Sequence, residues 1–283
     1  MRSYNKITLF FTVLTIPLLF MINGCEESEL VPEEEMLVVQ AYLYTGEPVD
    51  DIRVTWLNSF ANEDSVCQPV NNAEVTISSN DQVFELELFP GDSGYYYYPG
   101  NLPVICGEEY SLEVKVNQEE ITATTIVPVM PPLAEITDSI LYIKQVDEFY
   151  DMRGMEWPDP IDITWDNPDQ EYYFFVIDNL EGNPDLIFSF MEDEEEGFFG
   201  RKFSMITEPT QLDFYQIQPR SLIYFGKYMV RFFRVNEEYA RLYETIRQDS
   251  RDLNEPYSNI NNGLGIFTAF ACDSLYFEVK KEI

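Results

Sequence analysis

The side chains that could do chemistry in this chain of 283 residues are mainly carboxylates, because it holds 51 Asp and Glu residues and no histidine. Without histidine there is no Ser-His-Asp or Cys-His nucleophile, no His-ligated zinc or copper, and no histidine general base. A glycosidase needs two carboxyl groups held at a defined separation, which no sequence spacing specifies here. We therefore predict that the protein is not an enzyme and has no catalytic residues and no cofactor.

One acidic and aromatic segment offers oxygen ligands of the kind that calcium prefers. Its carboxylates are Asp159, Asp162, Asp166 and Asp169. Their spacing matches no EF-hand loop, which needs acids at alternate positions, a central glycine and a distal glutamate. We interpret them as solvated loop carboxylates and predict no metal site.

The four cysteines are the other reactive residues: Cys25, Cys67, Cys106 and Cys272. None of their spacings resembles a metal-binding knuckle. In an exported protein Cys67 and Cys106 are candidates for a disulfide, and closing a loop of about 40 residues would contribute about 4 kcal/mol. Cys272 is better explained as a small buried side chain than as a reactive thiol.

Residues 1–24 have the composition of a secretory signal. Arg2 and Lys6 precede an uncharged, mostly apolar run from Ile7 to Ile22, too short and too near the N-terminus for a stable spanning helix. Gly24 before Cys25 resembles a bacterial lipobox, which implies cleavage before Cys25 and attachment of acyl chains such as palmitate. The alternative is an ordinary signal peptide with a chance cysteine.

Residues 25–35 form an acidic tether in which six of the eleven positions are glutamate. Like charges in such a run repel one another, so we predict an extended, solvated spacer. An acidic cluster directly after a lipidated cysteine also resembles the signal that sends Bacteroidota lipoproteins to the cell surface. The sequence therefore favours a lipid-anchored outer-membrane protein exposed on the cell surface.

The composition of the mature chain limits its partners. Removal of the signal, which contains Arg2 and Lys6, leaves 15 basic and 51 acidic residues and a formal charge of −36. Such a chain repels the phosphates of nucleic acid and anionic lipid headgroups. Hydrophobic residues make up 45% of the sequence and aromatic residues 15%, which is too high for a disordered acidic chain and indicates filled cores.

Residues 36–128 have the pattern of a β-sandwich. Apolar residues alternate with polar ones in short segments separated by turn residues, as at Asn80-Asp81 and 90–94. No convincing helix interrupts them, which favours a sandwich of immunoglobulin-like or transthyretin-like type. The predicted strands are Leu37–Tyr44, Ile52–Leu57, Ala73–Ser78, Val83–Leu88, Tyr95–Tyr98, Tyr110–Val116 and Ile121–Val127.

A proline-rich linker at 129–134 leads to a second predicted domain at 135–283. We predict a second β-sandwich with one amphipathic helix inserted at about 236–253, where Asn236 is the N-cap. The fold class is therefore all-β, with two tandem sandwiches. The predicted strands of the second are Ser139–Val146, Ile161–Trp165, Tyr172–Ile177, Leu186–Phe190, Phe203–Ile206, Leu212–Ile217, Tyr224–Val235, Leu264–Ala271 and Leu275–Val279.

Two aromatic segments are candidates for contact with a ligand or partner. Alternation along the strand Tyr95–Tyr98 sends two rings to each face, so about half should lie in the core, and Tyr95 and Tyr97 are candidate contacts. Phe198 and Phe199 follow an acidic run and are typical of an exposed loop tip, where aromatic side chains carry binding energy. That loop could equally turn inward and cap the sandwich.

The segment from Asn236 to Phe267 points to a family. A tyrosine-rich amphipathic helix is followed by the sequence EPYSNINNGLGIF at 255–267. With the opening segment Val38–Leu43 and the strand Thr122–Pro128, it resembles a family of Bacteroidota outer-membrane lipoproteins classified as a domain of unknown function, type 4249. The resemblance covers essentially the whole mature chain. It implies an accessory role beside a TonB-dependent transporter and supplies no catalytic residues.

The segment Asn259–Gly265 also has a structural explanation. Gly263 and Gly265 permit positive φ or close backbone approach, and Asn261-Asn262-Gly263 is typical of a tight turn that leads into a strand. We favour this interpretation over a ligand-binding loop. A phosphate cradle is excluded because a strand follows the glycines and no lysine is placed to meet a phosphate.

We therefore predict a non-catalytic accessory or binding lipoprotein of a TonB-dependent transport system. Its partners would be the outer-membrane β-barrel and the lipid bilayer, which the acyl anchor on Cys25 enters, and not nucleic acid. The alternative is a stand-alone glycan-binding or adhesive surface module, which the aromatic residues at 95–98 and 198–199 favour.

Overall fold

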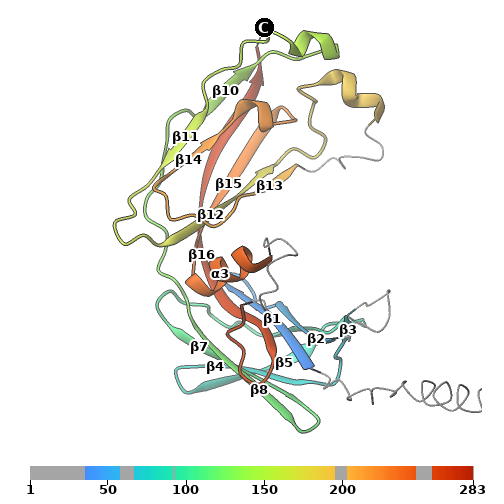
Figure 1. Ribbon diagram of the computed structural model, residues 1–283, viewed down its shortest axis with the longest axis vertical. Helices are drawn as coiled ribbons and strands as arrows, with labels where there is room; N and C mark the ends of the chain where they lie inside the picture. The colour runs from blue at the N-terminus through green and yellow to red at the C-terminus, as the bar shows by residue number, and fades with distance from the viewer. Residues whose placement is uncertain (1–35, 58–66, 92, 195–202, 247–256, 283) are drawn as a thin grey trace, which may run out of the picture. The chain divides into compact units, whose positions relative to one another are not determined.

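The computed structural model describes residues 36–57, 67–91, 93–194, 203–246 and 257–282. The chain divides into two units, Met1–Glu35 and Met36–Ile283, and every described residue belongs to the second. The described residues form sixteen β-strands, one α-helix and three short 3-10 helices (Figure 1). The prediction of an all-β fold of sandwich type with one helix is confirmed.

The strands before the linker form where apolar and polar residues alternate along the sequence. In β1 the side chains of Leu37, Val39 and Leu43 are at most 1% exposed, whereas Gln40 on the opposite face is exposed. All seven predicted strands are present, and the short β3 adds to them. They are β1 (Met36–Tyr44), β2 (Asp51–Leu57), β3 (Gln68–Pro69), β4 (Glu74–Ser79), β5 (Gln82–Leu88), β6 (Tyr95–Tyr97), β7 (Glu109–Val116) and β8 (Glu119–Ile126).

The hairpin between β4 and β5 forms where turn residues predict it. Asn80 and Asp81 have φ angles of 48° and 60°, and Ser79 pairs with Gln82 across them. A two-residue turn with positive φ at both positions matches the twist of the flanking strands, and Asn and Asp tolerate that conformation. The predicted turn is confirmed.

The strands after the linker differ from the prediction at three places, the first of which is the additional short strand β9 (Glu135–Ile136). The segment Leu186–Phe190 makes isolated bridges to Val146 and Tyr224 instead of a strand, and the two predicted terminal strands are one continuous strand. The elements are β9 (Glu135–Ile136), β10 (Ile140–Ile143), η1 (Phe149–Met152), β11 (Ile161–Thr164), β12 (Tyr172–Asn179), η2 (Ser189–Glu194), β13 (Ser204–Ile206), β14 (Phe214–Ile217), η3 (Pro219–Ser221), β15 (Gly226–Val235), α3 (Glu237–Ile246) and β16 (Leu264–Lys281).

One long path of strands and a smaller sheet enclose two main cores. The path runs β13-β12-β15-β16-β1-β2-β6-β5-β4-β7-β8, with β10 attached to β16 and β3 to β2. It turns back on itself, so that β4, β7 and β8 lie against β1 and β2 across the first core (Figure 1). A second sheet, β14-β11-β9, packs on β12, β15 and β16 around the second core.

The last strand, β16, contributes to both cores. Its 18 residues pair in parallel with β1 over 264–270 and antiparallel with β15 over 270–279. Phe267 and Ala269 lie in the first core, whereas Phe277 and Val279 lie in the second. The predicted division at 129–134 therefore needs correction, because the first core is completed by residues from the end of the chain. Two strands can pair in parallel only through a long crossover, which here contains β2 to β8 of the first sandwich and the whole second sandwich up to β15.

Helix α3 begins after Asn236, whose carbonyl accepts hydrogen bonds from the amides of Tyr239 (3.2 Å) and Ala240 (3.4 Å). The Asn236 side chain donates from Nδ2 to Thr125 Oγ1 (3.0 Å) and to the Ile126 carbonyl (2.8 Å), which fastens the start of the helix to β8. Positions 247–253 of the predicted helix lie outside the described residues. A third buried cluster, beside α3, contains Phe174, Val176, Phe233, Val235 and Phe270, with Tyr42, Tyr44, Tyr172, Tyr239 and Cys272 packed against it.

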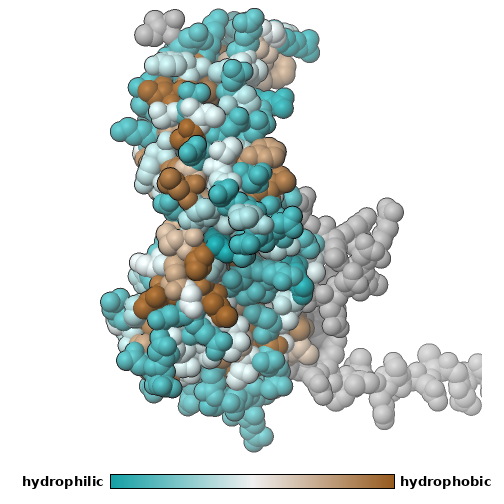
Figure 2. Space-filling view, turned by 90° about the vertical axis from the view of Figure 1, so that its left-hand side faces the viewer, coloured by the Kyte–Doolittle hydropathy of each residue, from teal (hydrophilic) through white to brown (hydrophobic). Residues whose placement is uncertain are grey.

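One face of the described unit is largely hydrophilic (Figure 2). On the face shown in Figure 2, polar side chains dominate and apolar side chains form separate patches. Among the described residues no helix has the length and apolar character needed to cross a membrane. No group of three or more Asp, Glu or Cys side chains in the described ranges is placed to hold a metal ion.

Candidate ligand-binding face

The four consecutive tyrosines divide between core and surface. Tyr96 is 1% exposed, and its hydroxyl donates to the Val70 carbonyl (2.8 Å) and accepts from the Ala73 amide (3.0 Å). Tyr95 and Tyr97 are half-buried on the opposite face of β6. The predicted alternation is confirmed, and it leaves these two rings pointing away from the first core.

Strand register brings further side chains to the same face as Tyr95 and Tyr97. Arg53 of β2 lies opposite Tyr95, and Gln40 of β1 lies opposite Arg53. In β5, Glu87 lies opposite Tyr97. Because neighbouring residues on adjacent strands share a face, these strands present one continuous surface. We call it the aromatic face, and its residues are Gln40, Tyr42, Asp51, Arg53, Glu87, Phe89, Tyr95 and Tyr97.

The side chains of the aromatic face contact one another. The Phe89 and Tyr97 rings meet edge to face with centroids 5.2 Å apart, and Phe89 is 46% exposed. The Arg53 guanidinium lies 5.4 Å from the Tyr95 ring centroid, and the Tyr97 hydroxyl donates to Glu87 Oε2 at 3.4 Å. Arg53 Nε is buried and has no hydrogen-bond partner among the described residues. The guanidinium therefore keeps an unsatisfied donor beside the rings.

Burial shifts the pKa values at one end of this face. It raises the pKa of Tyr42 to about 12, with the nearby Tyr239, Asp51 and Tyr95 acting in the same direction. Burial also raises the pKa of Asp51, with Asp50 adding to the effect, while a hydrogen bond from Tyr44 opposes it. At neutral pH the Tyr42 phenol therefore remains a hydrogen-bond donor.

The segment Asn259–Gly265 has a structural role. Asn259 accepts from the Phe267 amide (2.9 Å) and donates to the Phe267 carbonyl (2.7 Å), while the Asn261 amide donates to the Thr122 carbonyl (2.8 Å). Gly265 has φ +114°, and a Cβ there would lie 1.9 Å from the Val39 carbonyl oxygen. These contacts fasten the start of β16 between β1 and β8, in agreement with the tight-turn interpretation.

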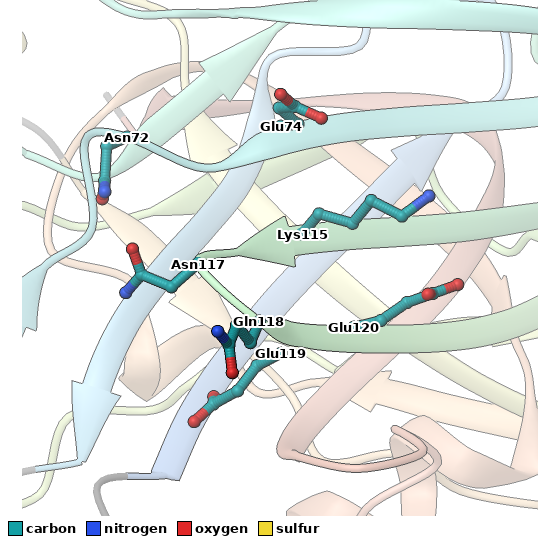
Figure 3. Close-up of a pocket in the computed structure, with 7 residues that line it drawn as sticks. All are labelled: Asn72, Glu74, Lys115, Asn117, Gln118, Glu119 and Glu120. Atoms are coloured by element: carbon teal, nitrogen blue, oxygen red, sulfur yellow. The ribbon is translucent and has the colours of Figure 1, made fainter.

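Two hollows lie among the described residues outside the aromatic face. One, of about 400 Å³, lies where α3 meets β8, and there Thr125 Oγ1 donates to Glu238 Oε1 (3.1 Å) while accepting from Asn236. The other, of about 260 Å³, lies at the β7–β8 hairpin. Figure 3 shows its side chains spreading outward from the strand ends, and Lys115 pairs with Glu113 at 2.6 Å. Neither hollow collects unused donors and acceptors around one point.

The remaining predicted site residues fall elsewhere. Cys25, Phe198 and Phe199 lie outside the described residues. Cys272 is half-buried, and burial raises the pKa of its thiol to about 11.

The predicted disulfide between Cys67 and Cys106 is wrong, because both thiols are free. Cys67 precedes Gln68, which pairs with Trp56 near the first residues of β1. Cys106 Sγ lies 3.7 Å from Thr45 Oγ1, just beyond the last residue of β1. The length of a nine-residue strand, about 27 Å, therefore separates the two cysteines, far beyond the reach of a disulfide.

Arg53, Phe89, Asp51 and Glu87 are members of the aromatic face that the sequence does not single out. They become neighbours of Tyr95 and Tyr97 only through the pairing of β6 with β2 and β5. The one available signal is alternation along β2, which places the Arg53 side chain on the face opposite the buried side chains of Ile52 and Val54.

Comparisons with known proteins identify a family without a described activity. Residues 25–275 match the family model described as "Domain of unknown function (DUF4249)". No curated protein matches the chain. A segment of two fibronectin type-III domains from chicken tenascin is 11% identical, with 86% of this chain and 98% of that chain covered and a TM-score of 0.23. A titin segment is 12% identical, with 86% and 62% covered and a TM-score of 0.21.

Proposed function

Because the chain belongs to the family "Domain of unknown function (DUF4249)", we propose that it is a lipid-anchored outer-membrane lipoprotein of Bacteroidota type that binds rather than catalyses. Its role in this proposal is that of an accessory protein of a TonB-dependent transporter at the cell surface. The observation that carries the binding role is the aromatic face, where Tyr95, Tyr97 and Phe89 point away from the core and remain accessible. Accessible aromatic side chains are enriched where proteins bind.

The anchor part of the proposal rests on Gly24 and Cys25 and on the glutamates that follow. Metabolic labelling with an alkyne analogue of palmitate should label the wild-type protein, and Cys25→Ser should abolish both the label and recovery in the membrane fraction. Cys67→Ser is the matched control, because Cys67 is exposed and its loss should leave both unchanged. Equal labelling of the Cys25→Ser protein would contradict the anchor.

Exposed apolar side chains in the linker at 129–134 support the proposal that the chain contacts the barrel. Val129, Met130 and Leu133 are 52%, 47% and 81% exposed, which places three apolar side chains in solvent within five residues. Exposed apolar side chains that lie together are found where proteins bind one another. In this proposal the barrel covers them.

The transporter role is tested by mild-detergent purification of C-terminally tagged protein from its own outer membrane. We expect a β-barrel transporter in stoichiometric amount, identified by mass spectrometry, and we expect Leu133→Asp to reduce its recovery. Leu180→Asp is the control, because Leu180 is also exposed (49%) but lies outside the linker. Wild-type protein that emerges without a barrel would overturn the accessory role.

A further inference from the structure

The aromatic face has the dimensions of a platform for an extended ligand. Two rows of side chains cross its four strands, and adjacent strands are about 4.8 Å apart, so each row spans about 14 Å. The first row contains Tyr42, Asp51, Tyr97 and Glu87, and the second contains Gln40, Arg53, Tyr95 and Phe89. A row of this length exceeds a single hexose ring and suits an oligomeric ligand.

Rings and hydrogen-bonding groups alternate along the first row, whereas in the second row Gln40 and Arg53 lie on one side and Tyr95 and Phe89 on the other. Tyr97 lies between strands that carry Asp51 and Glu87, and Tyr95 lies between those that carry Arg53 and Phe89. A pyranose ring presents apolar C–H groups on its face, which suit aromatic rings, and hydroxyls at its rim. Carboxylates accept hydroxyl hydrogens, while guanidinium and amide groups donate to hydroxyl oxygens.

Other classes of ligand fit this face less well. The formal charge of −36 on the mature chain repels nucleic acid and anionic glycans. A peptide added as a strand needs a free sheet edge, but β2 and β6 are each paired with neighbours on both sides here. The face is also an open sheet surface rather than an enclosed apolar cavity of the kind that small hydrophobic ligands occupy.

We propose that the aromatic face binds a neutral polysaccharide, with sugar rings stacked on Tyr95, Tyr97 and Phe89 and sugar hydroxyls bonded to Asp51, Glu87 and Arg53. This inference rests on the proposed binding function and names its ligand class. It does not depend on the transporter, because a surface glycan could be held with or without one.

The test is affinity electrophoresis of the full mature lipoprotein in detergent, through gels that contain one soluble polysaccharide each. The neutral probes are laminarin, galactomannan, xyloglucan and soluble starch, and the anionic probes are heparin and alginate. We expect at least one neutral probe to retard the protein and the anionic probes to leave its mobility unchanged. Tyr95→Ala, Tyr97→Ala and Phe89→Ala should each weaken that binding about tenfold or more.

Tyr142→Ala and Tyr276→Ala are matched controls, because these tyrosines are 54% and 58% exposed on β10 and β16, away from the aromatic face. Near-ultraviolet circular dichroism should show that every variant is folded. Absence of retardation by all neutral probes, or equal weakening by Tyr142→Ala and Tyr97→Ala, would overturn the proposal.

The same variants separate this inference from the transporter role. If Tyr97→Ala still co-purifies with a barrel but no neutral probe binds wild-type protein, the glycan proposal fails and the accessory role stands. If wild-type protein emerges without a barrel but is retarded by a neutral probe, the accessory role fails and the glycan proposal stands. Loss of the barrel on Tyr97→Ala, without glycan binding, would show that this face contacts protein instead.

Discussion

At the scale of single residues, Asp51 is a carboxylate whose charged form is disfavoured by partial burial. It lies on the aromatic face opposite Tyr42, and burial raises its pKa although Tyr44 donates a hydrogen bond to it. A buried charge loses hydration that one hydrogen bond replaces only in part. An acid at this position is consistent with a role in ligand binding rather than in stability.

Replacement of Asp51 by Asn should therefore stabilise the protein at neutral pH. The folded-state pKa of Asp51 is raised, so its contribution to stability is present below the unfolded-state pKa and is lost as pH rises through the folded-state pKa. The gain in unfolding free energy for Asp51→Asn should appear as pH rises from the unfolded-state pKa of Asp51 to its folded-state pKa. It should stay below about 1 kcal/mol, since the carboxyl is partly solvated. Urea unfolding at several pH values measures it. Glu85→Gln, at an exposed site, is the control, and an Asp51→Asn gain that is independent of pH would contradict this account.

The three cysteines of the described residues should all be free thiols. We expect the intact mass to be the same with and without reductant, and a mass lower by two hydrogens before reduction would show a disulfide. In the folded protein at pH 8, Cys67 should react first with a thiol reagent because it is exposed. Cys272 should react slowly, because a pKa of about 11 leaves little thiolate. All three should react together in guanidinium.

At the scale of elements, the entry into β16 depends on a glycine, because any other residue would place a Cβ against the backbone of β1. Gly265 combines φ +114° with a backbone carbonyl, that of Val39, in the place where a Cβ would stand. The parallel pairing of Val39 with Gly265 requires this close approach. Here the family signature encodes backbone geometry rather than ligand chemistry.

Gly265→Ala should cost about 3 kcal/mol or more, because φ strain and a backbone clash act together. Gly91→Ala is the matched control: Gly91 has φ +122° but no atom within 4 Å of the added Cβ, so strain alone should cost about 1 kcal/mol. Chemical denaturation of both variants measures the difference. Equal losses would show that the clash is relieved by a shift of β1, contrary to the tight packing described above.

At the scale of the whole described unit, the two sandwiches depend on one strand. β16 lies between β1 and β15, and the first core includes Ile260, Phe267 and Ala269 from the end of the chain. The third cluster, with Phe270 and Tyr44 stacked at 5.0 Å, adds aromatic contacts across the same strand. Stability of the first sandwich is therefore coupled to the second.

A fragment of residues 36–128 should not fold alone, because it lacks β16 and exposes one side of β1. We expect broad, poorly dispersed amide signals in its NMR spectrum and a tendency to aggregate through the open edge of β1. The fragment 36–282 is the control and should unfold in one cooperative transition. A well-dispersed spectrum from 36–128 would mean that this sandwich is an independent domain, as the linker at 129–134 suggests.

The sequence by itself determined the features that depend on near neighbours. The seven strands before the linker, the turn at Asn80-Asp81 and the division of Tyr95–Tyr97 between core and surface follow from alternation and turn chemistry within a few residues. The absence of histidine and the excess of acid follow from composition alone.

Only the tertiary structure decided which distant segments meet. The pairing of β16 with β1, the gathering of Arg53 and Phe89 around Tyr95 and Tyr97, and the separation of Cys67 from Cys106 all depend on strand order. Backbone hydrogen bonds are chemically the same for every strand, so local sequence does not specify a strand's partner. That choice is made by burial of whole faces and by close approaches such as that of Gly265 to Val39, which exist only once the chain has folded.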